Sequence, residues 1–481
     1  ELGERDNMRR ETEIAGVIVA ALAFPAIEKF APGSFDHHNI ELILTLLAAL
    51  CLMRMHEKPR AGAIAGLALG AATATAAESA PMLAAGLLIA GLLWLVRPKD
   101  YAPGLAWFGS GLAFSSLISF FVLVSPADWG RPVCDAMSTP FLGLGLIGGG
   151  IAVALGLAPE SLTSTFARRV GASAVLSGIG GVSLALLFPE CRGGGYAALN
   201  ADMETLWMSQ ISETRSLFSL VGDNIALACA TGGAALAGLV AAGLYLWRRW
   251  KKPEGWIVFG FLLAAWAILA WQIRGATFAT TLAIPFGAWA IARARRNYQI
   301  KTSALRLVVF AGVAASSAAA AWASAGQVLQ NQIMPRKTMV SFKTRSEDAK
   351  DCTSPAAFAP LNSLPAGVVL NQFSLGADVL LWTKHSVLAG PYHRDVTGTM
   401  TAINALRSSS QQAREIIAGS VADYVLVCPA LSETMFYAHH ATAGVVPEAT
   451  LSMKLAEDEP PDWLKAVPLK DTPLKLYRVK R

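Results

Sequence analysis

The chain has 481 residues, of which 54% are hydrophobic and only 15% are charged, and its mean hydropathy is +0.44. Soluble domains carry about 25% charged residues, so this composition excludes an ordinary soluble enzyme and indicates a protein that lies mostly in lipid. The formal net charge of +6 is attributed to cytoplasmic Lys and Arg that face anionic lipid, and it gives no support to nucleic-acid binding.

Apolar stretches recur through the first 325 residues, each near the roughly 20 residues that cross a bilayer. They predict a mainly α fold, a polytopic bundle of about eleven transmembrane helices. The predicted spans are 14–27, 40–53, 61–77, 80–96, 104–124, 139–158, 170–188, 222–247, 255–271, 276–292 and 304–325.

Basic residues are distributed unequally between alternate loops. The positive-inside rule places the more basic set, and with it the N-terminus, in the cytoplasm. An odd number of spans then puts everything after Ala325 outside. The more basic set holds 18 Lys and Arg against five in the other loops, and consists of 1–10, 54–60, 97–99, 159–169, 248–252 and 293–301.

Four of the six cysteines lie in segments that are predicted to be outside. Cys134 and Cys191 are in two outer loops, and Cys352 and Cys428 are in the C-terminal region. Disulfides form in such compartments, so two bridges are possible. The other two cysteines fall inside apolar helices and are interpreted as small core residues.

The composition changes after residue 330 to that of a soluble domain. Short β-rich runs alternate there with an amphipathic helix, which is typical of an α/β core. We therefore predict a transmembrane domain over 1–330 and an extracytoplasmic α/β domain over 331–481. The runs are strands at 368–373, 386–389, 424–427 and 474–479 and a helix at 399–417.

The start of the chain has neither an initiator Met nor a signal-peptide pattern. It resembles a cytoplasmic loop inside a longer protein. We expect an N-terminally truncated fragment with further helices upstream, and a true start at Met8 is the alternative.

A polar run, Phe35-Asp36-His37-His38-Asn39, separates two predicted spans. Ionisable groups at membrane depth cost about 3 kcal/mol each unless a site uses them, so this loop is interpreted as part of an active site. Asp36 with His37 or His38 is predicted to hold Mn²⁺ or Mg²⁺, because carboxylates suit hard cations and imidazole suits borderline ones. The alternative is a helix cap, in which Asp36 accepts backbone N–H bonds.

Two further ionisable residues stand at outer turns between apolar spans. Glu78 is either a site carboxylate or a structural partner of a neighbouring helix, since a lone carboxylate there is expensive. Arg274 is either a bidentate clamp for a phosphate or a side chain that extends to lipid headgroups.

The outer regions contain two more candidate sites. His385, His393 and Arg394 form the densest polar cluster of the C-terminal domain and are predicted to bind substrate, with a plain surface cluster as the alternative. Residues 202–218 are predicted to form an amphipathic helix on the membrane surface, which either covers a lipid-linked donor or anchors the chain through Trp207.

Residues 31–39, which read Ala-Pro-Gly-Ser-Phe-Asp-His-His-Asn, resemble the second acidic motif of GT-C membrane glycosyltransferases. The motif is closest to the Asp-His-His form of archaeal and bacterial relatives of the oligosaccharyltransferase catalytic subunit. Residues 382–394 are similar to a block in proteobacterial members of that superfamily.

The resemblance implies an enzyme of a bacterial inner membrane with a periplasmic C-terminal domain. It implies inverting transfer of a sugar from a polyprenyl-phosphate or pyrophosphate carrier to an extracytoplasmic glycan, lipid or protein. Asp36 and Glu78 would be catalytic, and Arg274 would hold the carrier phosphate.

Two family features have no counterpart in this sequence. No segment matches the acidic first outer loop, and Asn371–Gly376 stands where oligosaccharyltransferases have Trp-Trp-Asp-Tyr-Gly. Protein N-glycosylation is therefore not the expected activity. A multi-span transporter, an O-antigen ligase or polymerase, and a non-catalytic scaffold of envelope polysaccharide assembly remain alternatives.

Overall fold

The computed structural model describes the whole chain except residues 1, 35, 36, 197, 198, 200, 209, 210, 334–350 and 481. The chain divides into two compact units. Unit 2 includes a short segment that the sequence analysis assigned to the membrane part. Unit 1 consists of Glu1–Ala197 and Ile211–Pro335, and unit 2 of Ala198–Gln210 and Arg336–Arg481.

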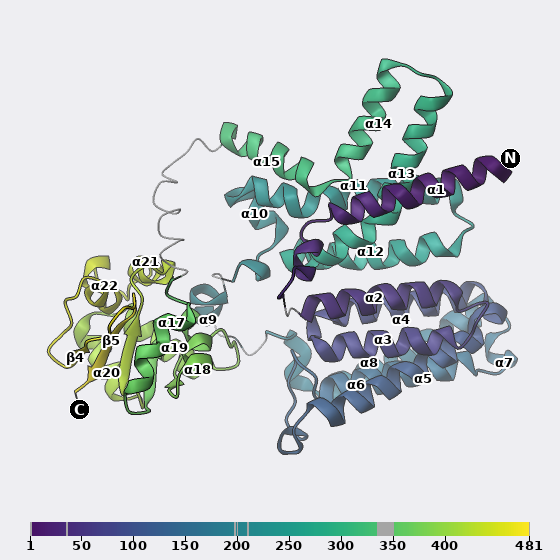
Figure 1. The fold of residues 1–481 in the computed structure, drawn as a ribbon. Helices are drawn as coiled ribbons and strands as arrows, with labels where there is room; N and C mark the ends of the chain where they lie inside the picture. Colours follow the sequence, from purple (N-terminus) through teal and green to yellow (C-terminus); the bar gives the residue numbers. More distant parts are fainter. Residues whose placement is uncertain are drawn as a thin grey trace. The chain divides into compact units, whose positions relative to one another are not determined.

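One group of long helices in unit 1 comes from residues 37–187, and its members lie side by side (Figure 1). Short turns connect most consecutive helices, and a longer loop over 124–138 connects α5 to α6. The group comprises α2 (His37–Arg54), α3 (Ala61–Thr75), α4 (Ala80–Val96), α5 (Pro98–Leu123), α6 (Thr139–Gly156), α7 (Glu160–Thr163) and α8 (Phe166–Leu187).

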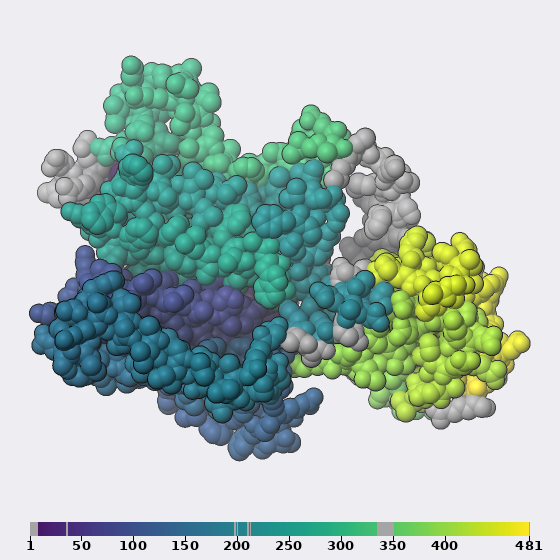
Figure 2. All heavy atoms as spheres, turned by 180° about the vertical axis from the view of Figure 1, so that it is seen from behind, coloured from purple at the N-terminus to yellow at the C-terminus, as the bar shows by residue number. Residues whose placement is uncertain are grey.

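A second group in unit 1 combines the N-terminal helix with helices from residues 217–333. α1 packs against α13, and α12 contacts α2 and α4 of the first group. In both views α14 and the C-terminal part of α13 project from the rest of the group (Figures 1 and 2). The group comprises α1 (Leu2–Ala21), α10 (Leu217–Asp223), α11 (Ile225–Arg249), α12 (Pro253–Trp271), α13 (Ala276–Ile300), α14 (Ala304–Ser316) and α15 (Ala319–Ile333).

Seven of the described helices are long and apolar enough to cross a membrane, and α14 with α15 forms an eighth candidate bent by 92°. The polytopic helical bundle is thus confirmed. The predicted number of about eleven spans is higher than the seven or eight candidates of the structure. The three other predicted spans are also helical, as α1, α2 and α3. α3 has only 15 residues, while charged residues in α1 and the polar start of α2 reduce their hydropathy.

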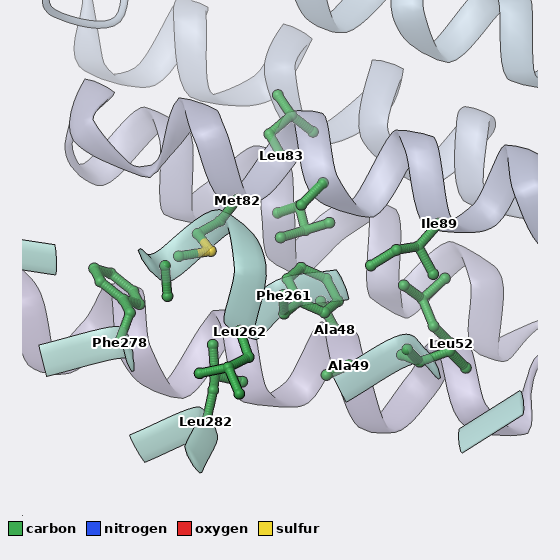
Figure 3. Packing of buried hydrophobic residues seen from close by; sticks show 14 of the residues in the cluster. Ala48, Ala49, Leu52, Met82, Leu83, Ile89, Phe261, Leu262, Phe278 and Leu282 are labelled. Carbon is green, nitrogen blue, oxygen red and sulfur yellow. The ribbon is translucent and has the colours of Figure 1, made fainter. Parts of the chain in front are cut away.

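An apolar core joins the two helix groups. Figure 3 shows side chains of α2, α4, α12 and α13 packed together, with Leu52 and Phe261 completely buried. This packing fixes the positions of the turns at the ends of these four helices.

Glycines bring α3 and α5 into close contact. Gly62, Gly66 and Gly70 follow one another at four-residue spacing on α3, so they share one face of the helix. A Cβ atom on Gly66 would lie 2.1 Å from the carbonyl oxygen of Phe108 on α5. Small residues at this spacing are the usual means by which membrane helices pack closely.

Unit 2 contains a five-stranded sheet with the order β2-β1-β3-β5-β4. β1 pairs in parallel with β2 and β3, and β5 pairs antiparallel with β3 and β4. The four predicted strands are present and β4 was not predicted. The strands are β1 (Val368–Asn371), β2 (Ser386–Val387), β3 (Tyr424–Val427), β4 (Leu464–Val467) and β5 (Lys475–Val479).

Short helices complete unit 2. The predicted helix over 399–417 is in fact two helices, because Ser409 caps α20 through a capping box with Gln412. The helices are α9 (Ala201–Leu206), α17 (Pro355–Phe358), α18 (Gly376–Trp382), α19 (Val396–Leu406), α20 (Ser410–Ala418), α21 (Ser432–His439) and α22 (Leu451–Ala456).

Both possible disulfides are present. Cys134–Cys191 joins the loop between α5 and α6 to the segment that follows α8. Cys352–Cys428 lies in the apolar core of unit 2, where it ties the start of the unit to the end of β3.

We predict that Gly66→Val destabilises the protein by about 1–3 kcal/mol, because the added atoms overlap the backbone of α5. Thermal unfolding in detergent measures the effect. Gly91→Val on α4 is the matched control, since a Cβ at that position meets nothing within 4 Å. Equal stability of the two variants would contradict the packing described for α3.

We predict that replacing Cys352 and Cys428 together by Ala destabilises unit 2 by about 2–5 kcal/mol, because the bridge closes a long loop in the unfolded chain. Melting curves with and without reductant measure this loss. Alkylation of the denatured, unreduced protein should label two thiols, Cys51 and Cys229. Six labelled thiols would contradict both bridges.

Candidate active site

Three interhelical segments meet at one end of unit 1. His37 and His38 begin α2, Glu78 lies on η2 (Ala77–Ser79) between α3 and α4, and Arg274 lies on η7 (Ile273–Gly275) between α12 and α13. We call this end the site end. The opposite end, where α4, α11 and α13 terminate, is called the basic end because it carries residues 97–99, 248–252 and 293–301.

The Glu78 carboxylate is the centre of the cluster. Its Oε1 atom lies 3.1 Å from His37 Nε2 and 2.9 Å from His38 Nε2. Its Oε2 atom accepts a hydrogen bond from Arg274 Nη1. Glu78 is thus a partner of two imidazoles and one guanidinium, so two residues predicted separately, Glu78 and Arg274, belong to one site.

Arg274 is mostly buried, with 14% of its side chain exposed. Besides the bond to Glu78, its Nη2 atom donates to the hydroxyl of Tyr196 at 3.2 Å. Its Nε–H group is buried and has no acceptor among the residues that the structure describes. The side chain therefore points into the cluster and does not extend to lipid headgroups.

Glu41 also belongs to the site, although the sequence analysis did not select it. It follows His37 by four residues on α2 and therefore lies on the same helix face. Its side chain is completely buried, and neither carboxylate oxygen has a hydrogen-bond partner among the described residues. The four-residue spacing between an imidazole and an acid was the signal that could have revealed it.

The cluster has the composition of a metal site. His37, His38, Glu41 and Glu78 each offer one ligand atom, and these atoms lie within 4.8 Å of one another. A buried carboxylate without a partner costs several kcal/mol, so Glu41 would gain from a bound cation. Two imidazoles with two carboxylates suit Mn²⁺ or Zn²⁺ better than Mg²⁺, which prefers oxygen. The predicted ligand Asp36 lies outside the described residues.

Backbone contacts hold the Arg274 turn in place. The Ile273 N–H group donates to the carbonyl oxygen of Arg215 at 2.8 Å, which ties η7 to the segment before α10. A Cβ atom on Gly275 would lie 2.3 Å from the backbone nitrogen of Leu269. Only glycine allows this turn to lie against α12.

The structure separates the predicted histidine cluster of unit 2. His385 is 4% exposed and precedes β2. Its Nδ1 atom accepts a hydrogen bond from Gly367 N–H, and its Nε2 atom lies 3.0 Å from the Leu361 carbonyl oxygen. Neither nitrogen remains for a ligand, so His385 is a buried structural residue. His393 and Arg394 follow β2, and Arg394 is exposed.

The segment over 202–218 is not one amphipathic helix. It is divided into α9, η6 (Ser212–Thr214) and the start of α10. Trp207 is 2% exposed and packs within unit 2, with ring centroids 6.5 Å from Phe373 and 6.3 Å from His393. Of the two alternatives for this segment, burial of Trp207 speaks against the interfacial anchor.

A buried polar network that the sequence did not reveal lies where β1 and β3 end. Gln372 accepts from Cys428 N–H at 2.7 Å, and Glu433 accepts from Ser374 N–H at 3.0 Å and from the Tyr437 hydroxyl at 2.7 Å. Burial raises the pKa of the Glu433 carboxyl, against the effect of these hydrogen bonds. The stability that Glu433 contributes therefore decreases as pH rises through its raised pKa.

No protein-family model and no curated protein matches the sequence. Solved structures are similar to this chain in fold, among them oligosaccharyltransferases of Archaeoglobus fulgidus. The complex of AglB with an inhibitory peptide and a dolichol-phosphate has a TM-score of 0.61 at 12% identity, and the match covers 95% of this chain and 58% of that one.

Two further structures of the archaeal enzyme are also similar to this chain in fold. The form tethered to an acceptor peptide with the NVT sequon has a TM-score of 0.56 at 13% identity, with 98% of this chain and 60% of that chain covered. The complex with Zn and sulfate has a TM-score of 0.54 at 12% identity, with 93% of this chain and 57% of that chain covered. This chain thus spans less than two thirds of the neighbours' length.

These matches extend over nearly the whole chain at 12–13% identity, a level at which they establish the fold. They show that this chain is similar in fold to archaeal oligosaccharyltransferases over nearly its whole length, which agrees with the predicted polytopic helical bundle and C-terminal domain. The chain is a multi-pass membrane protein with the fold of the archaeal oligosaccharyltransferases.

Proposed function

We propose that the protein is a membrane glycosyltransferase that moves a sugar from a polyprenyl-phosphate or pyrophosphate carrier to an acceptor outside the cytoplasm. The observation that carries the proposal is the cluster of His37, His38, Glu41, Glu78 and Arg274 at one end of a bundle with the GT-C fold. The archaeal structure with a TM-score of 0.61 was solved with a dolichol-phosphate.

The chemistry of the proposed reaction fits this cluster. In an inverting transfer the acceptor attacks the anomeric carbon while the bond to the carrier phosphate oxygen breaks, and the phosphate leaves as an anion. Arg274 is proposed to stabilise that anion, because its planar guanidinium matches phosphate geometry and its Nε–H group is unpaired among the described residues. Asp36 is proposed to take the proton of the acceptor.

Glu78 is proposed to act through its neighbours as well as through its own charge. It holds Arg274 and both imidazoles in one arrangement. His37, His38, Glu41 and Glu78 would hold a divalent cation, which would supply positive charge beside the leaving phosphate when bound. The related archaeal structure with Zn and sulfate supports a site for a divalent ion in this fold.

The site end is proposed to face the periplasm of a bacterial inner membrane. The Cys134–Cys191 disulfide lies at the site end, and disulfides persist in oxidising compartments. Most Lys and Arg of the interhelical loops lie at the basic end, which the positive-inside rule assigns to the cytoplasm. Unit 2 contains the second disulfide, which supports the same compartment for it.

Unit 2, described at 199, 201–208 and 351–480, is proposed to be a periplasmic domain that contributes to acceptor binding. His393 and Arg394 remain the candidates there, since His385 is occupied by backbone groups. The acceptor is a glycan, lipid or protein, and the absence of the Trp-Trp-Asp-Tyr-Gly sequence argues against an N-glycosylation sequon.

We predict that Glu78→Gln and Arg274→Gln each reduce sugar transfer by about 10²–10³-fold. Arg274→Gln removes positive charge from beside the leaving phosphate, and Glu78→Gln removes the carboxylate that holds Arg274 and the two imidazoles in place. Arg274→Lys should restore little of the transfer activity, because an ammonium group lacks the planar, two-pronged geometry of the guanidinium group. The assay measures transfer of radiolabelled sugar from a set of polyprenyl-linked donors by membranes that contain the protein.

Glu213→Gln is the matched control for these variants. Glu213 is a half-exposed carboxylate that pairs with Lys29 at 3.5 Å, also at the site end, but it lies outside the cluster. Its substitution should leave transfer unchanged. Full activity of Glu78→Gln, or no transfer from any donor by the wild-type membranes, would refute the proposed function.

We predict that Mn²⁺ raises the melting temperature of the purified protein and that EDTA reverses the effect. A cation at 100 times its Kd should stabilise the fold by about 2.7 kcal/mol. His38→Ala and Glu41→Gln should abolish the stabilisation, because each removes one of the four ligands.

His56→Ala is the control for the metal experiment, since His56 lies beside Glu57 outside the cluster. It should respond to Mn²⁺ as the wild type does. A melting temperature that is insensitive to Mn²⁺ and Zn²⁺ would exclude the metal while leaving transfer itself to be decided by the sugar assay.

A further inference from the structure

An apolar groove of about 790 Å³ lies between α4 and the first turns of α12, at the basic end of unit 1. Its walls are aliphatic and aromatic, and its volume falls within the range of about 300–1,000 Å³ that is typical of ligand pockets. The groove lies at the opposite end of these helices from Glu78 and Arg274, so it belongs to a different site. Its wall residues include Ile89, Leu92, Leu93, Phe259 and Leu263.

The mouth of the groove combines aromatic and cationic side chains. Trp250 and Trp256 are 64% and 47% exposed, and Arg97 and Lys251 line the same opening. The Lys251 ammonium group lies 5.4 Å from the centre of the Trp250 ring. Exposed Trp beside Lys and Arg is the composition of a protein surface at the level of lipid headgroups.

A second pocket, of about 600 Å³, adjoins the groove and shares Trp250 and Lys251 with it. Five cations line this pocket: Arg248, Arg249, Lys251, Lys252 and Arg293. Among the described residues neither pocket is lined by an Asp or Glu, and none of these five cations forms a recorded ion pair. An adjacent pocket, which Arg249 and Arg293 also line, contains two acids, Glu13 and Glu254, so the cations remain in excess. An excess of positive charge attracts an anion.

We propose that the groove and the adjoining basic pocket together form a binding site for one anionic phospholipid. An acyl chain would occupy the groove along α4 and α12, and the headgroup phosphate would lie on Lys251 and the neighbouring arginines. Trp250 and Lys251, which line both pockets, lie where the acyl chain of such a lipid would meet its headgroup.

Charge complementarity favours an anionic lipid over a zwitterionic one. A choline or ethanolamine headgroup would bring a further positive charge among the five cations of the pocket, whereas a headgroup with net negative charge relieves their repulsion. A free phosphate would satisfy only the basic pocket and would leave the adjoining groove unfilled, so the combination of the two pockets points to a lipid.

Such a lipid would contact the two helices that lead to the candidate active site. α4 begins beside Glu78, and α12 ends just before Arg274. A molecule wedged between the other ends of α4 and α12 would stabilise their packing. The expected readout is therefore binding and thermal stability, both of which are independent of any transferase assay.

The test uses the full protein in detergent, with binding of phosphatidylglycerol followed by native mass spectrometry and by thermal shift. Phosphatidylglycerol should raise the melting temperature, and phosphatidylcholine should not. Arg249→Gln combined with Lys251→Gln should weaken phosphatidylglycerol binding at least tenfold. Leu92→Trp, which narrows the groove and keeps every cation, should weaken it as well.

Lys58→Gln combined with Lys301→Gln is the matched control, because it removes two exposed charges at the basic end outside both pockets. This control should bind phosphatidylglycerol as the wild type does. Equal loss in the control, equal binding of phosphatidylcholine, or equal stabilisation by water-soluble glycerol phosphate would each overturn the proposal. Unchanged binding by Leu92→Trp would overturn the assignment of the acyl chain to the groove.

Discussion

The candidate site depends on one buried ion pair, between Glu78 and Arg274. Its partners lie 196 residues apart in the sequence, on turns that separate α3 from α4 and α12 from α13. Each charge alone would be expensive at this depth, and a buried pair is stable only when further hydrogen bonds satisfy it. Tyr196 supplies one such bond to Arg274, and the two imidazoles lie against Glu78. Four segments of the chain are thereby held at one point.

The pair leaves one charge unbalanced, and this imbalance is the strongest argument for a ligand. Arg274 donates its hydrogen bond to Glu78, so the buried carboxylate of Glu41 is left among His37, His38 and the Ser79 hydroxyl with no close hydrogen bond among the described residues. A bound cation would neutralise it. Because His37, His38 and Glu78 point their ligand atoms at the same place, a divalent ion would satisfy Glu41 and complete the cluster at once. The same ion would add positive charge where a carrier phosphate has to leave.

Sequence reasoning selected residues that interrupt the apolar pattern and passed over one that does not. His37, His38, Glu78 and Arg274, which the structure brings together, stood out because ionisable residues are costly between apolar spans. Asp36 was selected for the same reason and stays a prediction, because it lies outside the described residues. The pairing of Glu78 with Arg274 could not be predicted, since it depends on how α12 packs against α2 and α4. Glu41 was missed because it lies inside a predicted span. His385 was selected because it is close to His393 in sequence, whereas in the fold both of its ring nitrogens lie against backbone groups. The strand pattern of unit 2 was predicted well, since β1 and β3 are continuous buried apolar runs.

Fewer helices qualify as membrane spans than the sequence analysis predicted, and at α2 the reason bears on function. α2 falls short of a typical span because its first turn is made of His37, His38 and Asn39, with Glu41 in the next. The polar residues that lower the hydropathy of α2 are the same residues that form the candidate site. Packing against other helices has to compensate for the low hydropathy of α2. α2 packs closely against α3, and Leu52 on α2 is buried in a core that includes Phe261. A site at the end of a tightly packed helix can therefore hold charge that an isolated helix in lipid could not.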